Sequence, residues 1–339
     1  MKNITKVGLS ALAGSLVMVS ANAVEYSMSG GLQSVYSTQD SPTTAETTNG
    51  KGLTTATDLT FSAAGELDNG FTVGYMMAVD TDGSLSNTSS QLTVGMGSLG
   101  TLQVNNKAGS KANAIDDITP HAYNETWDGL STVNPSTFGS RTSSGSLDYR
   151  IPAQELMGVT LNASVTLDPN ASEGSVTKGG VGTTSVSGTA YTLQLAHESG
   201  LEIGGGVESV DDDSGIAKAS GTEEVTAYVK YAAGGLTVAY QEGYTNSRNG
   251  TSVTGADVET SFMGIAYTAG DMTVSYGESS TQTKAVSATA AGVEAELESL
   301  QVAYTMGAMT IAAAMSETTG ASAATDQYEE NTLSINFAF

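Results

Sequence analysis

The side chains of this chain that could do chemistry are mainly carboxylates, and several of them gather in one long polar stretch, residues 106–143. The acids are Asp116, Asp117, Glu125 and Asp128, and the bases Lys107, Lys111 and Arg141 stand near the ends of the same stretch. Carboxylates in a narrow, partly desolvated passage lower the energy of cations and raise that of anions. The chemistry predicted by this cluster is therefore attraction of ions by charge.

The same stretch carries large side chains that a solvated surface loop would lack. It contains the only tryptophan, Trp127, together with Pro120, His121, Tyr123 and Phe138. A disordered external loop would be polar throughout, whereas long ordered loops pack their own apolar groups. We therefore expect the stretch to fold against an inner wall of the protein, with an external hairpin as the alternative.

Catalytic and metal-binding patterns find little support in the sequence. Neither His121 nor His197 stands at a recognisable spacing from a nucleophile and an acid. The chain has no Cys, which excludes thiol catalysis and cysteine metal sites. The Gly-rich run 201–206 is not followed by Lys-Ser, so we interpret its glycines as aids to strand packing or curvature. We expect no enzyme activity, no catalytic residue and no metal site.

One acidic run is a candidate for a hard cation. The sequence Asp211-Asp212-Asp213-Ser214-Gly215 clusters oxygen ligands of the kind that calcium prefers. Its spacing matches no EF-hand loop, so a solvated acidic loop is the simpler interpretation. Weak Ca²⁺ binding by acidic loops is the one cofactor hypothesis that the sequence offers.

The beginning of the chain has the pattern of a secretory signal peptide. Lys2 and Lys6 precede the apolar stretch 7–19, and the small residues Ala21 and Ala23 frame a cleavage site. The apolar stretch is shorter than the about 20 residues of a membrane-spanning helix, and no later stretch approaches that length. We predict a signal peptide over residues 1–23 and a mature chain of residues 24–339. Without the two signal lysines, ten basic residues stand against 36 acidic ones, a net charge of −26, which argues against nucleic acid as a partner.

The elements that must position the acids are strands, because apolar residues alternate with polar ones along most of the mature chain. The pattern begins with Tyr26, Met28, Leu32 and Tyr36 and ends with Leu333, Ile335, Phe337 and Phe339. It breaks into about sixteen segments. A soluble sandwich also alternates, but here the polar face is too poor in packing groups to form a core.

The connections between these segments alternate strictly between short and long. Six short ones are Gly-bearing turns, at 68–70, 98–100, 199–200, 233–235, 269–271 and 306–308. Long polar connections lie between them, at about 41–55, 81–88, 106–143, 168–187, 211–221, 246–256, 281–292 and 317–326. This alternation is typical of an outer-membrane barrel with short periplasmic turns and long external loops. We predict an all-β fold, a 16-stranded antiparallel transmembrane β-barrel.

With these features the chain resembles the general diffusion porins of Gram-negative outer membranes, in particular their sixteen-stranded trimeric type. The resemblance runs from the strand at Val24-Glu25-Tyr26 to Phe339, and its most specific element is the longest connection, 106–143, after the fifth strand. In those porins the third loop at this place folds into the lumen and narrows it. Two family features are absent: the loop signature Pro-Glu-Phe-Gly-Gly-Asp and the arginine cluster on the opposite wall.

The resemblance implies function and partners. It implies passive passage of ions and small hydrophilic solutes, homotrimers in the outer membrane among lipids and lipopolysaccharide, and no catalysis. It also implies that Phe339 belongs to the signal read by the outer-membrane assembly machinery. A plugged barrel acting as a surface adhesin or structural anchor is the alternative, since polar loops suit both.

The inward-facing positions of the strands predict the selectivity. Acids outnumber bases there: Asp58, Glu66, Asp148, Asp168, Glu202 and Glu208 against Arg150 and Lys230. Together with the acids of 106–143 they predict a preference for cations. Two places fit the pattern less well, since Glu294, Glu296 and Glu298 share the parity of Leu300, and Glu259 shares that of Ile265. Either these acids stand above the bilayer or a bulge intervenes.

Overall fold

The computed structural model describes most of the mature chain. The described residues are 24–41, 50–80, 86–128, 137–139, 142, 145–169, 186–212, 221–248, 257–284, 294–320 and 327–339. The predicted signal peptide, residues 1–23, lies outside this set, so it stays a prediction. Among the described residues no helix is long and apolar enough to cross a membrane.

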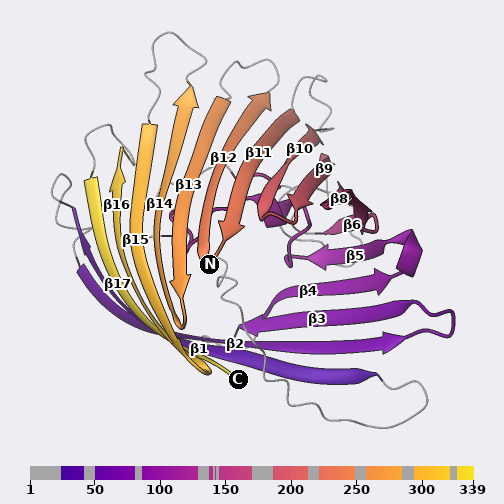
Figure 1. Ribbon diagram of the computed structural model, residues 1–339, viewed down its shortest axis with the longest axis horizontal. Coiled ribbons are helices and arrows are strands. Elements are labelled where there is room, and N and C mark those ends of the chain that lie inside the picture. Colours follow the sequence, from indigo (N-terminus) through magenta and orange to yellow (C-terminus); the bar gives the residue numbers. More distant parts are fainter. Residues whose placement is uncertain are drawn as a thin grey trace.

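The fold is one antiparallel β-sheet that closes on itself (Figure 1). Its strands are β1 Glu25–Asp40, β2 Gly50–Glu66, β3 Thr72–Asp80, β4 Ser86–Gly95, β5 Thr101–Asn106, β6 Ser146–Arg150, β7 Gln154–Leu156, β8 Val159–Asp168, β9 Val186–His197, β10 Leu201–Asp212, β11 Gly221–Ala233, β12 Leu236–Arg248, β13 Asp257–Ala269, β14 Met272–Lys284, β15 Glu294–Met306, β16 Met309–Thr319 and β17 Gln327–Ala338. Two short 3₁₀ turns, η2 Gly97–Leu99 and η3 Asn113–Ile115, flank β5.

Two of these strands, β6 and β7, are the two parts of one interrupted strand of the barrel wall. Both β6 and β7 pair with β8, and residues 151–153 separate them. Pro152 in this gap has no N–H to donate to a sheet, which explains why the strand is interrupted there. With β6 and β7 counted as one strand, the wall has sixteen strands, which confirms the predicted 16-stranded antiparallel barrel.

The two ends of the chain seal the barrel. Strand β17 pairs with β1 from Gly31 opposite Ala338 to Asp40 opposite Glu329. Below this register the Gly30 N–H donates to the Phe339 carbonyl oxygen (2.7 Å), and the Phe339 N–H donates to the Gly30 oxygen (2.9 Å). A Cβ on Gly30 would lie 2.6 Å from Cζ of Phe339, so this glycine leaves room for the terminal ring. Phe339 is thus part of the seam that closes the sheet.

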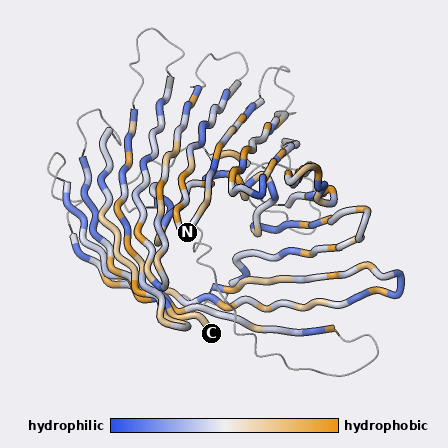
Figure 2. Tube along the Cα trace, in the orientation of Figure 1, coloured by the Kyte–Doolittle hydropathy of each residue, from blue (hydrophilic) through white to orange (hydrophobic). Residues whose placement is uncertain are grey.

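The outer and inner faces of the wall follow the predicted alternation. In β15, Leu300, Val302 and Tyr304 are exposed outward, whereas the polar residues Ser299 and Gln301, which alternate with them, are buried inward. An apolar outer face over a polar inner one is the arrangement that lets a closed sheet face lipid. Figure 2 shows the apolar colour gathered toward the turn ends of β13 to β17 and the polar colour toward their loop ends.

The acids that share the parity of the outward apolar residues lie on the outer face, at the loop ends of their strands. Glu294, Glu296 and Glu298 are exposed, and β15 pairs with β14 and β16 without a register shift. Glu259 likewise keeps the parity of Ile265 in an unbroken β13. These acids therefore stand beyond the apolar band, and no bulge is needed. The described pairings show a register shift elsewhere, between Ala78 and Val79 on β3.

The short connections carry the predicted glycines. Gly200 has φ +91°, and a Cβ there would lie 1.9 Å from the Ala232 carbonyl oxygen, so a side chain does not fit this turn. One further turn, Met157-Gly158 between β7 and β8, was not predicted from the sequence; both of its residues have positive φ (52° and 79°). Its signal was weak because Met rarely takes this conformation.

Candidate functional site

The chain between β5 and β6 lies inside the barrel. We call residues 107–145 the inner loop; its described part is 107–128, 137–139, 142 and 145. In Figure 1 its purple trace runs behind β11 to β13, across the interior of the barrel. The contacts below connect it to strands on most sides of the wall. The prediction that this loop folds into the lumen is confirmed.

Aromatic side chains of the inner loop pack into three apolar clusters with the wall. Their wall partners are mostly small or apolar residues that face inward. The clusters are Ala112, Ile115 and Phe138 with Ala190 and Tyr228; Tyr123 with Ala303, Ala312 and Ala314; and Trp127 with Phe262 and Leu297. The three aromatic residues that suggested packing, Tyr123, Trp127 and Phe138, are thus all buried anchors.

Polar wall side chains bind the backbone of the inner loop. Gln241 on β12 accepts the Ile118 N–H at Oε1 (2.9 Å) and donates from Nε2 to the Ile115 oxygen (2.8 Å). Gln301 on β15 accepts the Tyr123 N–H (2.8 Å) and donates to the carbonyl oxygen of Asn124 (2.7 Å). Because an irregular buried segment must satisfy its backbone groups, these amides replace the hydrogen bonds that water would give.

Glycines of the wall make room for the loop. A Cβ on Gly264 would lie 2.9 Å from Thr119 Cβ and 3.0 Å from Pro120 Cδ, and one on Gly206 would lie 2.5 Å from the Phe138 ring. The loop therefore approaches the wall closely at positions where only glycine leaves the space. In the run 201–206, interpreted as easing packing, Gly206 makes room for the loop, whereas Gly204 makes room for the Tyr228 side chain of the neighbouring strand.

Asp148 on β6 is a buried anchor of the inner loop. Its side chain is fully buried. Oδ2 accepts the Lys111 N–H (3.2 Å) and Nε of Arg150 (2.8 Å), and Oδ1 accepts the hydroxyl of Thr166 (2.9 Å). Arg150 also donates from Nη2 to Gln103. The expected pore-lining pair thus lies at the start of the loop, where its charges balance each other.

A second base on the wall is paired in the same way. Lys230 Nζ lies 3.2 Å from Glu202 Oε2, and the other oxygen of Glu202 accepts the hydroxyl of Tyr228 (2.7 Å). Gln194 donates to that hydroxyl (2.9 Å). This network faces the lumen beside the first apolar cluster. Both Glu202 and Lys230 are half-buried and held in fixed positions.

The acids of the inner loop differ in their surroundings. Asp117 is buried, and its Oδ1 accepts both the N–H (2.7 Å) and the hydroxyl (2.6 Å) of Thr119. Burial nevertheless raises the pKa of this carboxyl above its usual range. His121 lies against the Thr119 oxygen (Nδ1, 3.2 Å), and burial lowers the pKa of its ring.

The remaining predicted residues are spread along the loop and the wall. Asp116, Glu125 and Asp128 are partly exposed on the loop. Asp58 lies directly opposite Asp80, on β2 and β3. Arg141 lies outside the described residues, as do Asp213 to Gly215 of the candidate calcium run. In the part of the chain that the structure describes, no three His, Cys, Asp or Glu side chains form a group that could hold a metal.

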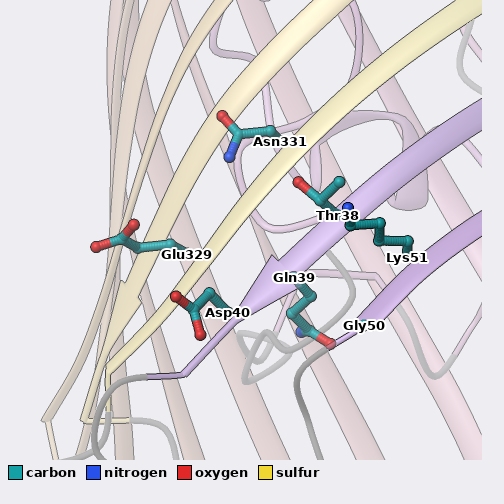
Figure 3. A pocket seen from close by; sticks show the side chains of 7 residues that line it. All are labelled: Thr38, Gln39, Asp40, Gly50, Lys51, Glu329 and Asn331. Atoms are coloured by element: carbon teal, nitrogen blue, oxygen red, sulfur yellow. The ribbon is translucent and has the colours of Figure 1, made fainter.

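A separate pocket of about 480 Å³ lies at the loop ends of β17, β1 and β2 (Figure 3). Its lining residues are Thr38, Gln39, Asp40, Gly50, Lys51, Glu329 and Asn331. Asp40 shares the parity of Tyr36, and Glu329 shares that of Leu333, both of which are exposed on the outer face. This pocket therefore opens outside the barrel and is distinct from the lumen.

Sequence reasoning missed the wall residues that hold the loop. Gln241, Gln301 and Ser275, whose hydroxyl accepts the Ala122 N–H (2.8 Å), are ordinary polar residues at inward positions. The sequence indicated only that these residues face inward, and many other inward Ser, Thr and Gln residues do so without holding the loop.

Comparisons with known proteins agree with this architecture. A family model described as Gram-negative porin matches residues 8–297. No curated protein gives a significant sequence match. Among solved structures, an anion-selective porin from Comamonas acidovorans is 12% identical with a TM-score of 0.68, and the alignment covers 93% of this chain and 100% of that one.

Two further structures share the fold. The Salmonella typhi OmpF complex with daunomycin is 12% identical, with a TM-score of 0.68 and 96% of this chain and 100% of that chain covered. In vitro folded OmpT of Vibrio cholerae, in a trimer form, is 9% identical, with a TM-score of 0.66 and 93% and 99% covered. With the family match over most of its length and a closed barrel of sixteen antiparallel strands, this chain belongs to the Gram-negative porins and forms an outer-membrane β-barrel.

Proposed function

We propose that the mature chain forms a water-filled, cation-preferring channel for passive diffusion of ions and small hydrophilic solutes across the outer membrane. The inner loop is held against the wall by side-chain and glycine contacts on several strands, as a fixed constriction requires. The loop thus has one defined position, which suits a permanent pore with no chemical step.

The single observation that carries cation preference is the pairing of the wall bases. Among the described strand residues, Arg150 and Lys230 are the basic side chains on the inner face, and each forms an ion pair with an acid, Asp148 and Glu202. Further inward acids then give the wall a net negative charge: Asp58, Asp80, Asp168, Glu208 and Glu224. In a low-dielectric passage such a field favours cations.

Selectivity is not set by the fold that the neighbours share. The Comamonas acidovorans neighbour is described as anion-selective, at 12% identity. Because charge placement decides selectivity in barrels of the same shape, the acids of this wall support the opposite preference.

The partners follow from the family and the seam. We propose a homotrimer, as in the trimer form of the Vibrio cholerae neighbour, embedded among outer-membrane lipids and lipopolysaccharide. Phe339, half exposed at the seam, is proposed as part of the signal read by the assembly machinery. We assign no catalytic activity and no resident cofactor.

Single-channel recording in planar bilayers tests the channel. The purified protein is expected to insert with stepwise increases in KCl conductance, each closing in three equal steps as a trimer would. An absence of conductance from folded protein would instead support the plugged surface adhesin or structural anchor, which the family does not favour.

A further inference from the structure

The inward side chains of the wall differ in exposure between two sides of the barrel. Every described inward residue is buried in three stretches of β13, β14 and β15, at 260–266, 275–281 and 295–303. None is buried in three stretches of β1, β2 and β3, at 27–39, 54–66 and 72–78. The inner loop covers the first group, as Trp127 does where it packs on Phe262 and Leu297. We call the lumen side of β13 to β15 the covered side and that of β1 to β3 the open side.

Two acids of the open side lie beside the point where the inner loop reaches β1. Gln33 on β1 donates from Nε2 to the Tyr123 hydroxyl of the loop (3.2 Å). Asp58 on β2 lies opposite Gly31, two positions from Gln33 and on the same face, and Asp80 on β3 lies opposite Asp58. Both acids are half-exposed. They therefore stand on the open wall close to the tip of the loop.

Two further acids lie around the Tyr123 side chain. Burial raises the pKa of Tyr123 above its usual range, and the charges of Glu330 and Asp128 also raise it, so both carboxylates lie near its hydroxyl. Glu330 on β17 has the inward parity of Ser334 and accepts the Thr332 hydroxyl (3.0 Å). Asp128 is a half-exposed residue of the inner loop. Carboxylates of the wall and of the loop thus come together where the loop meets the open side.

The bases of the protein are placed elsewhere. On the described parts of β17, β1, β2 and β3 the one base is Lys51, which lines the pocket outside the barrel. Arg150 and Lys230 face the lumen from β6 and β11, each paired with an acid. Lys107 and Lys111 belong to the root of the inner loop, next to the end of β5. The electrostatic field on the open side is therefore negative.

We propose that ions and solutes cross the lumen along the open side, and that Asp58, Asp80 and Glu330 are the wall residues that make this passage prefer cations. The proposal rests on the proposed channel function and names the residues that give it its specificity. Four inward acids on β6 to β11 are at most 2% exposed instead: Asp148, Asp168, Glu208 and Glu224. Because the Coulomb energy falls with distance, half-exposed acids that a passing ion can approach act on it more strongly than these.

Zero-current potentials in a KCl gradient test the specificity. Asp58→Asn, Asp80→Asn and Glu330→Gln are each expected to lower the permeability of K⁺ relative to Cl⁻ about twofold or more, since each removes a charge from the passage. Asp168→Asn, at a buried inward position, is expected to lower it less, and Glu296→Gln, on the outer face, to leave it unchanged. An equal loss in Asp168→Asn, or no loss in the three passage variants, overturns the assignment.

Thiol labelling tests the open side without any need for conductance. The chain has no Cys, so each introduced cysteine reports alone. Thr60→Cys, two positions beyond Asp58 on β2, is expected to react with a cationic methanethiosulfonate at least about tenfold faster than Ser279→Cys, which is buried on the covered side. Mass spectrometry of the folded protein measures both rates, and retained heat-modifiable gel mobility verifies that each variant is folded.

The outcomes separate the passage from the channel. Faster labelling of Thr60→Cys in a protein that does not conduct would contradict the channel and support the placement of the open side. Equal labelling of the two variants, or faster labelling of Ser279→Cys, overturns that placement even in a protein that conducts.

Discussion

Asp148 and Glu208 occupy the same kind of inward position in the alternating strand pattern, but the groups that surround their carboxylates differ. The two acids lie in one row of the sheet, since Asp148 is opposite Thr166, Thr166 opposite Ala190, and Ala190 opposite Glu208. Both are buried, yet Asp148 binds a loop N–H, a hydroxyl and a guanidinium, whereas Glu208 binds no protein group. Asp148 therefore holds the loop in place, whereas the carboxylate of Glu208 faces the lumen without a hydrogen bond to the protein.

The largest effect is expected when the Asp148 region is broken. Asp148→Ala leaves Arg150 without its counter-ion and the Lys111 N–H without its acceptor, a change that costs about 3 kcal/mol for a buried pair. The temperature at which folded protein loses its heat-modifiable gel mobility is expected to fall. Glu208→Gln is expected to leave that temperature unchanged or raise it, because both carboxylate oxygens of Glu208 are buried without a hydrogen bond. Equal losses in the two variants would mean that the regions do not differ.

A smaller effect is expected from crowding the wall under the loop. Gly264→Ala places a Cβ 2.9 Å from Thr119, and such overpacking costs about 1 to 3 kcal/mol. Displacement of the loop is expected to increase single-channel conductance and to shift the emission of Trp127 to longer wavelength as its ring becomes wet. Gly74→Ala, whose Cβ meets nothing nearer than 3.9 Å, is the control. Unchanged conductance and emission in the first variant would contradict the close approach.

The polar anchors are expected to matter next. Gln241→Leu leaves the Ile118 N–H and the Ile115 carbonyl without partners, and each unsatisfied buried group costs about 1 to 3 kcal/mol. Because other anchors remain, we expect the loop to stay in place but to fluctuate, seen as more frequent brief closures in single-channel records. Gln282→Leu, a change on the outer-face parity of β14, provides the comparison. If neither variant shows more frequent brief closures, Gln241 is not needed to hold the loop.

The smallest effect is expected from pH. Burial raises the pKa of Asp117 above 3.8 and lowers that of His121 below 6.5. As pH falls through these values, Asp117 loses a negative charge and His121 gains a positive one, so cation preference is expected to decline on acidification. The zero-current potential, measured at stepped pH, is expected to decline less in Asp117→Asn. An identical decline would place the titrating groups elsewhere.

The sequence was sufficient for the barrel because its signals are local and repeated. Alternation from Tyr26 to Phe339 and glycines such as Gly200 and Gly270 specify strands and turns without knowledge of distant contacts. The aromatic residues Tyr123 and Trp127 indicated an inward loop for the same reason, since they lie within the loop itself.

The fastening of the loop was not predictable in this way. Gln241 and Gln301 meet loop residues 123 and 178 positions away, so nothing near them in the chain marks them. The same applies to Asp148 and Glu208, which parity alone assigned to the lumen together. Which of them is neutralised depends on the side chains that the closed barrel brings against each carboxylate.

The zero-current potential of the wild-type protein in a KCl gradient tests the central claim most directly. Because both inward bases are paired and acids outnumber bases on the described inner wall, a potential of the sign of the K⁺ equilibrium potential is expected. A potential of the sign of the Cl⁻ equilibrium potential would contradict the account, even in a protein that conducts as a trimer.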